Sequence, residues 1–149
     1  MSQVECCPRV PVSWGELVDK ITILQIKSER ISAREARANV ARELASLSRV
    51  AGEAIRNRLM TPLIGQLRAV NEELWEIEDK IREREAQGDF GHGFVQLARA
   101  VYKKNDLRAA IKRRINEALG SELIEEKSYA GWAAMTAGQS GMSANTPAL

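Results

Sequence analysis

PLIGQLRAVNEELWEIEDKI, residues 62–81, has the clearest helical pattern in the chain. Its apolar residues alternate four and three positions apart without exception, which is the spacing of a coiled-coil seam. The seam consists of Leu63, Leu67, Val70, Leu74, Ile77 and Ile81. Thr61 and Pro62 suit the start of a helix, and Gly88 suits the left-handed position just after one. We therefore expect one long helix over residues 62–86, about 37 Å long at about 1.5 Å per residue.

A helix is also expected on the N-terminal side of this stretch, beginning at Ser13. Residues 13–16 (SWGE) have the form of a capping box, in which the serine hydroxyl accepts a hydrogen bond from the amide three positions on. Apolar residues then recur on one face, namely Leu17, Ile21, Leu24 and Ile31. This helix ends near Ser32, which is suited to cap a second, alanine-rich helix. The apolar face of the second helix is formed by Val40, Leu44, Leu47, Ala51 and Ile55.

A fourth helix follows the glycine-rich turn at residues 91–93. It is expected over about residues 94–119, ending at Gly120, and residues 121–129 are expected to form a short additional helix. No stretch alternates as a strand would, and no repeat of roughly 20–50 residues occurs. The expected fold class is therefore all-α: an antiparallel bundle, or long helical hairpins, of three to four helices plus a short C-terminal helix.

The two ends of the chain are expected to lie outside this bundle. Pro8 and Pro11 favour an extended arm over residues 1–12. The bundle domain covers residues 13–129, and residues 130–149 contain no charged side chain and are expected to form a disordered tail. Because a slender bundle leaves apolar surface uncovered, we also expect a homodimer.

The composition limits the functions open to this chain of 149 residues, which is about the length of one domain. Its 22 basic and 20 acidic side chains give a net charge of +2, which argues against a dedicated nucleic-acid or membrane-surface protein. No apolar run approaches the roughly 18–20 residues of a transmembrane helix, and the first residues lack the layout of a signal peptide, so we expect a cytoplasmic protein. Two cysteines and one histidine argue against a disulfide scaffold and a metal site, and no cofactor motif occurs.

Polar residues interrupt the apolar faces at positions where core residues belong. Six of them, on three helices, are candidate ligand-binding residues: Lys20, Lys27, Glu78, Asn105, Arg108 and Lys112. On the fourth helix, Asn105, Arg108 and Lys112 lie between Val101 and Ile115, so the apolar stripe of this helix is polar for two turns and then apolar again. Burying such charges unpaired costs several kcal/mol, so they require partners or a wet cavity.

Two interpretations of these residues are open. In the structural one, long side-chain stems cover apolar surface while the charged heads reach water or pair with Glu78, Asp79, Glu125 or Glu126. In the functional one, cations of two helices converge on an anionic small molecule, which Asn105 and Glu78 orient. Cations around one enclosed cavity would favour binding, whereas cations that are each paired with a carboxylate would favour the structural role.

Specific motifs occur along the whole bundle. They are SWGE at 13–16, DKITIL at 19–24, LW at 74–75, IED at 77–79, ND at 105–106, IKR at 111–113, GSE at 120–122 and EEKSY at 125–129. Over about residues 12–129 the chain resembles an uncharacterised bacterial family of short all-helical proteins, with Trp14 in place of a small aliphatic residue. The resemblance implies no activity. It implies a context near glycosyltransferase and cell-surface polysaccharide functions, with a glycosyltransferase as a candidate partner.

The leading hypothesis is a helical binding or accessory module. Its polar seam either holds an anionic ligand such as a phosphosugar or fixes the helix register. The alternative is a small all-helical enzyme, in which Arg108, Lys20 and Lys27 stabilise negative charge and Glu78 acts as acid or base. Chorismate-mutase-like folds work in this way, and the comparison is an analogy of site chemistry. RNA binding through the basic fourth helix is a third hypothesis.

Overall fold

The computed structural model describes residues 5–128 and contains four α-helices. They are α1 (Trp14–Arg30), α2 (Arg34–Ala51), α3 (Met60–Ala86) and α4 (His92–Ala118), with a short 3₁₀-helix, η1 (Gly52–Arg56), between α2 and α3. No strand occurs among the described residues, and the predicted all-α fold is confirmed.

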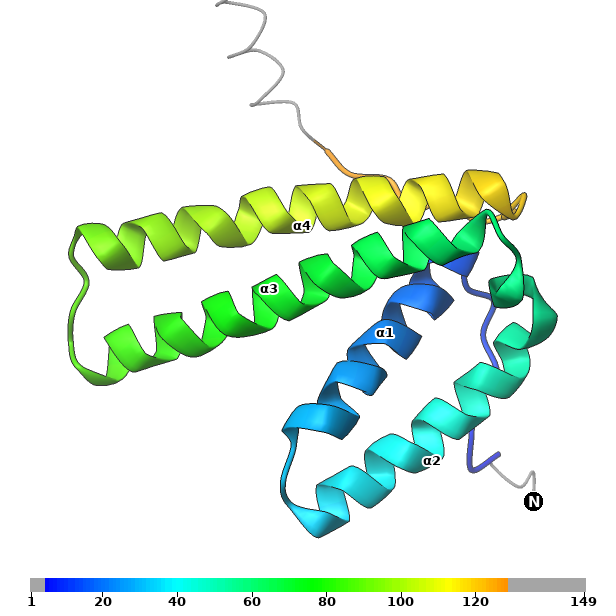
Figure 1. Ribbon diagram of the computed structural model, residues 1–149, viewed down its shortest axis with the longest axis horizontal. Helices are drawn as coiled ribbons and strands as arrows, with labels where there is room; N and C mark the ends of the chain where they lie inside the picture. Colours follow the sequence, from blue (N-terminus) through cyan, green and yellow to red (C-terminus); the bar gives the residue numbers. More distant parts are fainter. Residues whose placement is uncertain (1–4, 129–149) are drawn as a thin grey trace, which may run out of the picture.

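The helices form two antiparallel hairpins (Figure 1). The long hairpin consists of α3 and α4, joined by residues 87–91, where Gly88 adopts a φ of 64° that favours glycine. The shorter hairpin consists of α1 and α2 and lies against one half of the long one. Helix α1 contacts all three other α-helices, whereas α2 packs mainly on α1. Helix α1 is therefore central and joins the two hairpins.

The core lies on two opposite faces of α1. On one face, Leu17 and Ile21 pack with Ala51 and the half-buried Leu44 and Leu47 of α2. The other face contributes to the main core, which consists of Val18, Met60, Leu63, Leu67, Val70, Leu74, Ile111 and Ile115. Since both faces are covered by apolar neighbours, any polar residue on the second face of α1 is buried between α3 and α4.

The helix ends differ from the sequence expectations by small shifts. Ser13 caps α1 as predicted, its hydroxyl accepting a hydrogen bond from the Glu16 amide at 3.2 Å. Helix α2 begins at Arg34 without a side-chain cap. Helix α3 begins two residues before Pro62, and α4 begins two residues before Phe94. Shifts of this size are ordinary at helix ends, where few backbone hydrogen bonds define the boundary.

The short helix predicted over residues 121–129 does not form over residues 121–128. Gly120 adopts a φ of 62°, and the Ser121 amide donates to the Asn116 carbonyl at 2.8 Å, which ends α4 and reverses the chain. Leu123 and Ile124 are exposed, so no apolar face is buried that would stabilise a further helix. Residue 129 and the predicted tail over residues 130–149 lie outside the described residues.

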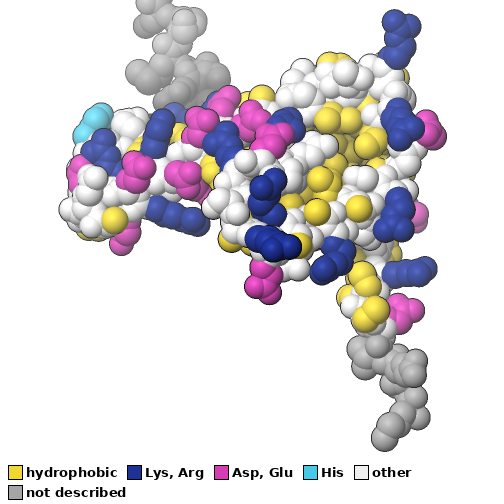
Figure 2. Space-filling view, turned by 60° about the horizontal axis from the view of Figure 1, so that its bottom comes forward, with side chains coloured by type: hydrophobic (Ala, Val, Ile, Leu, Met, Phe, Trp, Pro, Cys, Tyr) yellow, Lys and Arg dark blue, Asp and Glu magenta, His cyan; other side chains and the backbone are white. Residues whose placement is uncertain are grey.

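The apolar seam of α3 is buried for only part of its length. Leu67 and Leu74 are buried, whereas Ile77 and Ile81 are half-buried, because the α1–α2 hairpin covers only one half of the long hairpin (Figure 1). On the face shown in Figure 2, hydrophobic side chains gather over the α1–α2 hairpin, whereas the free end of the long hairpin carries charged side chains of both signs. The homodimer expected from the sequence stays a prediction.

Candidate functional site

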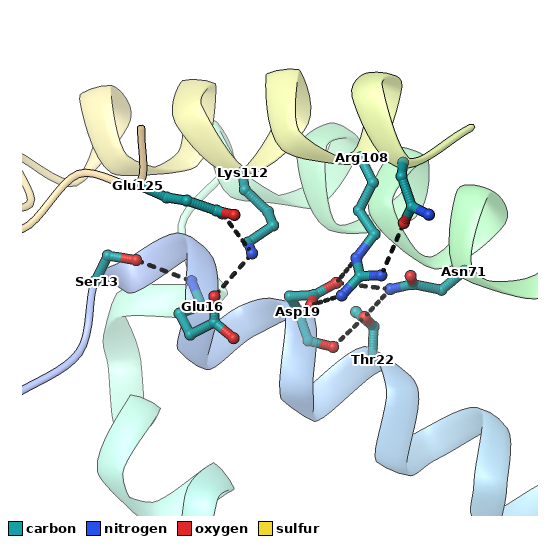
Figure 3. Close-up of polar contacts among 9 residues, drawn as sticks. Ser13, Glu16, Asp19, Thr22, Asn71, Arg108, Lys112 and Glu125 are labelled. Atoms are coloured by element: carbon teal, nitrogen blue, oxygen red, sulfur yellow. Dashed lines mark hydrogen bonds and ion pairs between the residues drawn. The ribbon is translucent and has the colours of Figure 1, made fainter. Parts of the chain in front are cut away.

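A group of buried and half-buried polar residues lies between α1, α3 and α4; we call it the polar seam, and it consists of Asp19, Thr22, Asn71, Arg108 and Lys112. A salt bridge between α1 and α4 is at its centre (Figure 3). Arg108 of α4 donates through Nε and Nη2 to the two oxygens of the Asp19 carboxylate on α1, at 3.0 and 2.8 Å. The Asp19 side chain is 2% exposed and the Arg108 side chain is 28% exposed. Two bonds to one buried carboxylate hold the guanidinium in a single orientation. The pair therefore fixes the register of α1 against α4.

Side chains of α1 and α3 complete the hydrogen bonding of Asp19. The Asn71 amide nitrogen donates to Asp19 Oδ1 at 2.9 Å and to Thr22 Oγ1 at 3.0 Å. The Thr22 hydroxyl donates to the Asp19 carbonyl at 2.7 Å. No buried side-chain polar atom of the described residues lacks a hydrogen-bond partner. The seam is thus a fully satisfied network, which is the condition under which an interior tolerates charge.

One turn further along α4, Lys112 is buried between two carboxylates. Its side chain is 6% exposed, and Nζ lies 2.7 Å from Glu16 Oε2 and 2.7 Å from Glu125 Oε2. Burial lowers the pKa of Lys112, but the hydrogen bonds to Glu125 and Glu16 more than offset burial and raise the pKa above its usual value. The ammonium group therefore stays charged at neutral pH.

Helices α1 and α4 approach most closely at Gly15. The Gly15 amide donates to Oδ1 of the buried Asn116 at 2.6 Å. A Cβ atom on residue 15 would lie 2.6 Å from the Lys112 carbonyl oxygen. Only glycine leaves room for this approach of two backbones. The approach in turn brings Glu16 within reach of the Lys112 ammonium group.

Two pockets lie beside the seam, and Arg108 lines both. The small pocket, about 170 Å³, is lined by Asn105, Arg108, Ala109, Lys112, Glu125 and Lys127. The larger one, which we call the groove, is about 390 Å³ and is lined by Glu16, Asp19, Lys20, Ile23, Leu24, Lys27, Glu43 and Arg108. The wall of the small pocket contains three cations and one carboxylate, whereas the groove has three of each.

Five of the six candidate ligand-binding residues line one of these pockets: Lys20, Lys27, Asn105, Arg108 and Lys112. Glu78 is exposed and lines neither. Arg30, the last residue of α1, pairs with Glu76, so Glu78 lies on the part of α3 where α1 has ended. The sequence put Glu78 one heptad after Asn71 on α3 but could not show where the neighbouring helix stops.

Three of the four candidate cations have a carboxylate partner. Besides Arg108 and Lys112, Lys20 pairs with Glu43 at 2.8 Å in an exposed ion pair. Lys27 is half-buried and lines the groove, and its ammonium group makes no hydrogen bond or ion pair with another described residue. The structural interpretation accounts for three of the cations through their carboxylate partners and for Lys27 through burial of its stem with the charged head toward water.

The sequence did not single out Asp19, the carboxylate at the centre of the seam. The sequence pattern that indicates a buried Asp19 is a second stripe on α1. Four buried residues recur in it at spacings of four, three and four positions: Gly15, Asp19, Thr22 and Ile26. This stripe lies opposite the Leu17–Leu24 face. A helix with stripes on two faces is a central helix, and a carboxylate in the second stripe requires a cation from a neighbour.

The Lys112–Glu125 ion pair predicts a pH dependence of stability. The hydrogen bond from Lys112 holds the pKa of Glu125 below its usual value of 4.5, so the stabilisation is present above that pH and is lost as the pH falls through the lowered pKa. We expect Glu125→Gln to lower the free energy of unfolding at pH 7 by less than about 1 kcal/mol, since the carboxylate is partly exposed.

Urea denaturation at a series of pH values measures this difference. The gap between the wild type and Glu125→Gln should be constant from about pH 6 to 8 and should close in acid. Glu126→Gln is the matched control, because the Glu126 side chain is 74% exposed and its contact with Arg113 is 3.5 Å long. A gap that persists unchanged below the lowered pKa would contradict the ion pair.

The chemistry available at the site is that of fixed hydrogen-bond donors and positive charge. No group of three or more side chains that could ligate a metal occurs among the described residues. None of the described helices combines the length and the apolar character needed to cross a bilayer. Guanidinium, ammonium and amide groups held by a rigid network bind carboxylate and phosphoryl groups.

Comparison with known proteins finds a family match over most of the chain. Residues 8–144 match the model of a protein family described as a family of unknown function (DUF6165). No curated protein and no solved structure matches the chain. The match agrees with the resemblance to an uncharacterised family and assigns no activity to any residue.

Proposed function

Because the chain belongs to this family of unknown function (DUF6165), we propose its function from the site alone: a helical binding module that holds an anionic small molecule at Arg108. In this proposal a carboxylate or phosphoryl group of the ligand occupies the small pocket. The uncharged remainder of the ligand lies in the groove. A phosphosugar has this combination of groups.

The hydrogen-bond donors fixed around the small pocket are the observation that carries the proposal; the charges of Arg108 and Lys112 are themselves balanced by Asp19 and Glu16, which do not line this pocket. Arg108, Lys112 and Lys127 line it against the single carboxylate of Glu125, and Asn105 adds an amide. Arg108 uses three of its five N–H groups, two on Asp19 and one on Asn105. Two donors therefore remain on a guanidinium whose orientation is already fixed, and such preorganisation favours binding.

The groove has the features of a site for hydroxyl groups. The carboxylates of Glu16 and Glu43 accept hydrogen bonds, Lys27 donates them, and Ile23 and Leu24 supply apolar surface. A volume of about 390 Å³ falls within the roughly 300–1,000 Å³ of small-molecule sites. Because Arg108 lines both pockets, we propose that a ligand bound to it in the small pocket extends past this side chain into the groove.

The biological setting is a further part of the proposal. We place the module in the cytoplasm of a bacterium, beside a glycosyltransferase or another enzyme of polysaccharide assembly, and as a homodimer. These parts rest on the resemblance and on the slender shape of the long hairpin rather than on contacts within the site. Catalysis at the same site is the alternative, and its proposed acid or base, Glu78, lines neither pocket.

Thermal-shift measurements on the full chain test the proposal. The compounds are hexose phosphates, nucleotide sugars and small dicarboxylates, with the free hexose as the uncharged control. A ligand at about 100 times its Kd stabilises the folded state by about 2.7 kcal/mol, which raises Tm by several degrees. We expect this shift with a phosphorylated hexose and none with the free hexose.

Lysine substitutions assign the shift to the site. Lys127→Gln and Lys27→Gln each remove one cation from a pocket wall without breaking an ion pair among the described residues. We expect each to weaken binding about fivefold. Lys103→Gln, on the exposed surface of α4, is the matched control and should leave the shift unchanged. Equal shifts in all four proteins would remove both pockets from the site.

A further inference from the structure

We infer that Glu125 is a built-in competitor for the ligand: its carboxylate occupies the anion position on Lys112, and ligand binding displaces this side chain into solvent while Lys127 stays on the wall of the small pocket. This inference rests on the proposed function and adds two properties of the same site. It identifies the chemical group that the small pocket accepts. It also gives the site a closed state, with Glu125 on Lys112, and an open state, with the Glu125 carboxylate in solvent.

The first observation is that the contact between Glu125 and Lys112 is dispensable for neutralising the buried ammonium group. Glu16 lies at the same distance from Lys112 Nζ, 2.7 Å, on the opposite side (Figure 3). If the Glu125 carboxylate moves away, Lys112 remains paired with Glu16, so no buried charge is left without a partner. The side chain of Glu125 is 40% exposed, so its carboxylate can return to water at little cost.

The second observation is the way in which the segment over residues 121–128 is attached. Ser121 is anchored, because its hydroxyl accepts a hydrogen bond from the Trp14 amide at 3.2 Å and donates one to the Leu123 carbonyl at 2.7 Å. Beyond Leu123 the described chain is exposed and non-helical. Its ion pairs there are those of Glu125 with Lys112 and of Glu126 with Arg113. The Glu125 side chain can therefore turn out to solvent without disturbing a helix, while Ser121–Leu123 stays fixed.

The carboxylate of Glu125 indicates the chemistry of the ligand that displaces it. A carboxylate on the ligand makes the same hydrogen bonds to Lys112 as the carboxylate of Glu125. A phosphoryl group makes them with a further oxygen and a larger charge, so it competes more strongly. A hydroxyl group is uncharged and does not compete with a carboxylate for an ammonium group. The site therefore accepts ligands with a terminal carboxylate or phosphoryl group and excludes neutral sugars.

Calorimetric titration of the full chain tests the competition. Inorganic phosphate and a hexose phosphate are titrated into the wild type, Glu125→Gln and Glu126→Gln. Removing the competing carboxylate should lower the Kd of both compounds about fivefold in Glu125→Gln. Glu126→Gln removes a neighbouring carboxylate that lines neither pocket and should keep the wild-type Kd.

Carboxyl ¹³C NMR of Glu125 is the second measurement. In the free protein its pKa is lowered, chiefly by the hydrogen bond from Lys112. Saturation with hexose phosphate should bring the pKa back toward its usual value, because the ligand has taken that hydrogen bond. Equal Kd values for the wild type and Glu125→Gln, or an unchanged Glu125 pKa at saturation, would overturn the inference and leave the proposed function standing. Failure of all three proteins to bind either compound would overturn both.

Discussion

Arg108→Ala is expected to lower the free energy of unfolding by about 3–5 kcal/mol. The substitution leaves the Asp19 carboxylate, whose side chain is 2% exposed, without a cation. Asn71 still donates to that carboxylate, but one neutral donor does not replace a charged group with two hydrogen bonds. Urea denaturation at pH 7, followed by circular dichroism, measures the loss.

Two comparisons make this prediction specific. Arg114→Ala removes an exposed arginine of the same helix that donates to Gln66 at 3.2 Å, and its effect should stay within about 0.5 kcal/mol. The double variant Asp19→Ala/Arg108→Ala should cost less than the sum of its single substitutions, because it also removes the buried carboxylate that Arg108→Ala alone leaves without a cation. If Arg108→Ala costs no more than Arg114→Ala, the buried pair does not exist as described.

Gly15→Ala is expected to lower the free energy of unfolding by about 2–3 kcal/mol. Alanine is the better helix former by about 1 kcal/mol, so propensity alone predicts the opposite sign. The new Cβ would lie 2.6 Å from the Lys112 carbonyl oxygen and 3.0 Å from Asn116 Oδ1. Because a helical backbone cannot yield as a flexible side chain does, α1 and α4 must separate. The same denaturation experiment measures the effect.

Gly65→Ala is the matched control for this substitution. Gly65 also lies within a helix, and a Cβ there meets nothing within 4 Å. Alanine at residue 65 should therefore raise the free energy of unfolding by about 0.5–1 kcal/mol. The two glycine substitutions are expected to have opposite signs. Stabilisation by both would contradict the close approach of α1 and α4.

The fold could be predicted from periodicity because each helix has an apolar face that must be buried. The seam of α3, the cap at Ser13 and the glycine after α3 all depend on local spacing and local hydrogen bonds. The predicted short helix after Gly120 failed for a non-local reason. Apolar Leu123 and Ile124 favour a helix only if a neighbour buries them, and both remain exposed.

The candidate site was predictable in part, because helical periodicity determines which side chains of a helix point toward the core. Arg108 and Lys112 stand at core positions of α4, and the structure places both in the seam. Their partners were not predictable, because pairing depends on where α1 crosses α4. That crossing is set by Gly15, whose missing side chain gives no signal of its own in a single sequence. The length of α1 likewise decides that Glu78 stays outside both pockets.

In the proposed complex, Arg108 and Asn105 present hydrogen-bond donors to the bound anion. NMR titration of ¹⁵N-labelled protein with a hexose phosphate detects these contacts through the arginine Nε–H and side-chain amide signals. We expect saturable shifts of the Arg108 and Asn105 signals and none at Arg114, which lies on the same helix and lines neither pocket. Equal shifts at Arg114, or no saturable shift at Arg108, would show that the anion does not bind at this site.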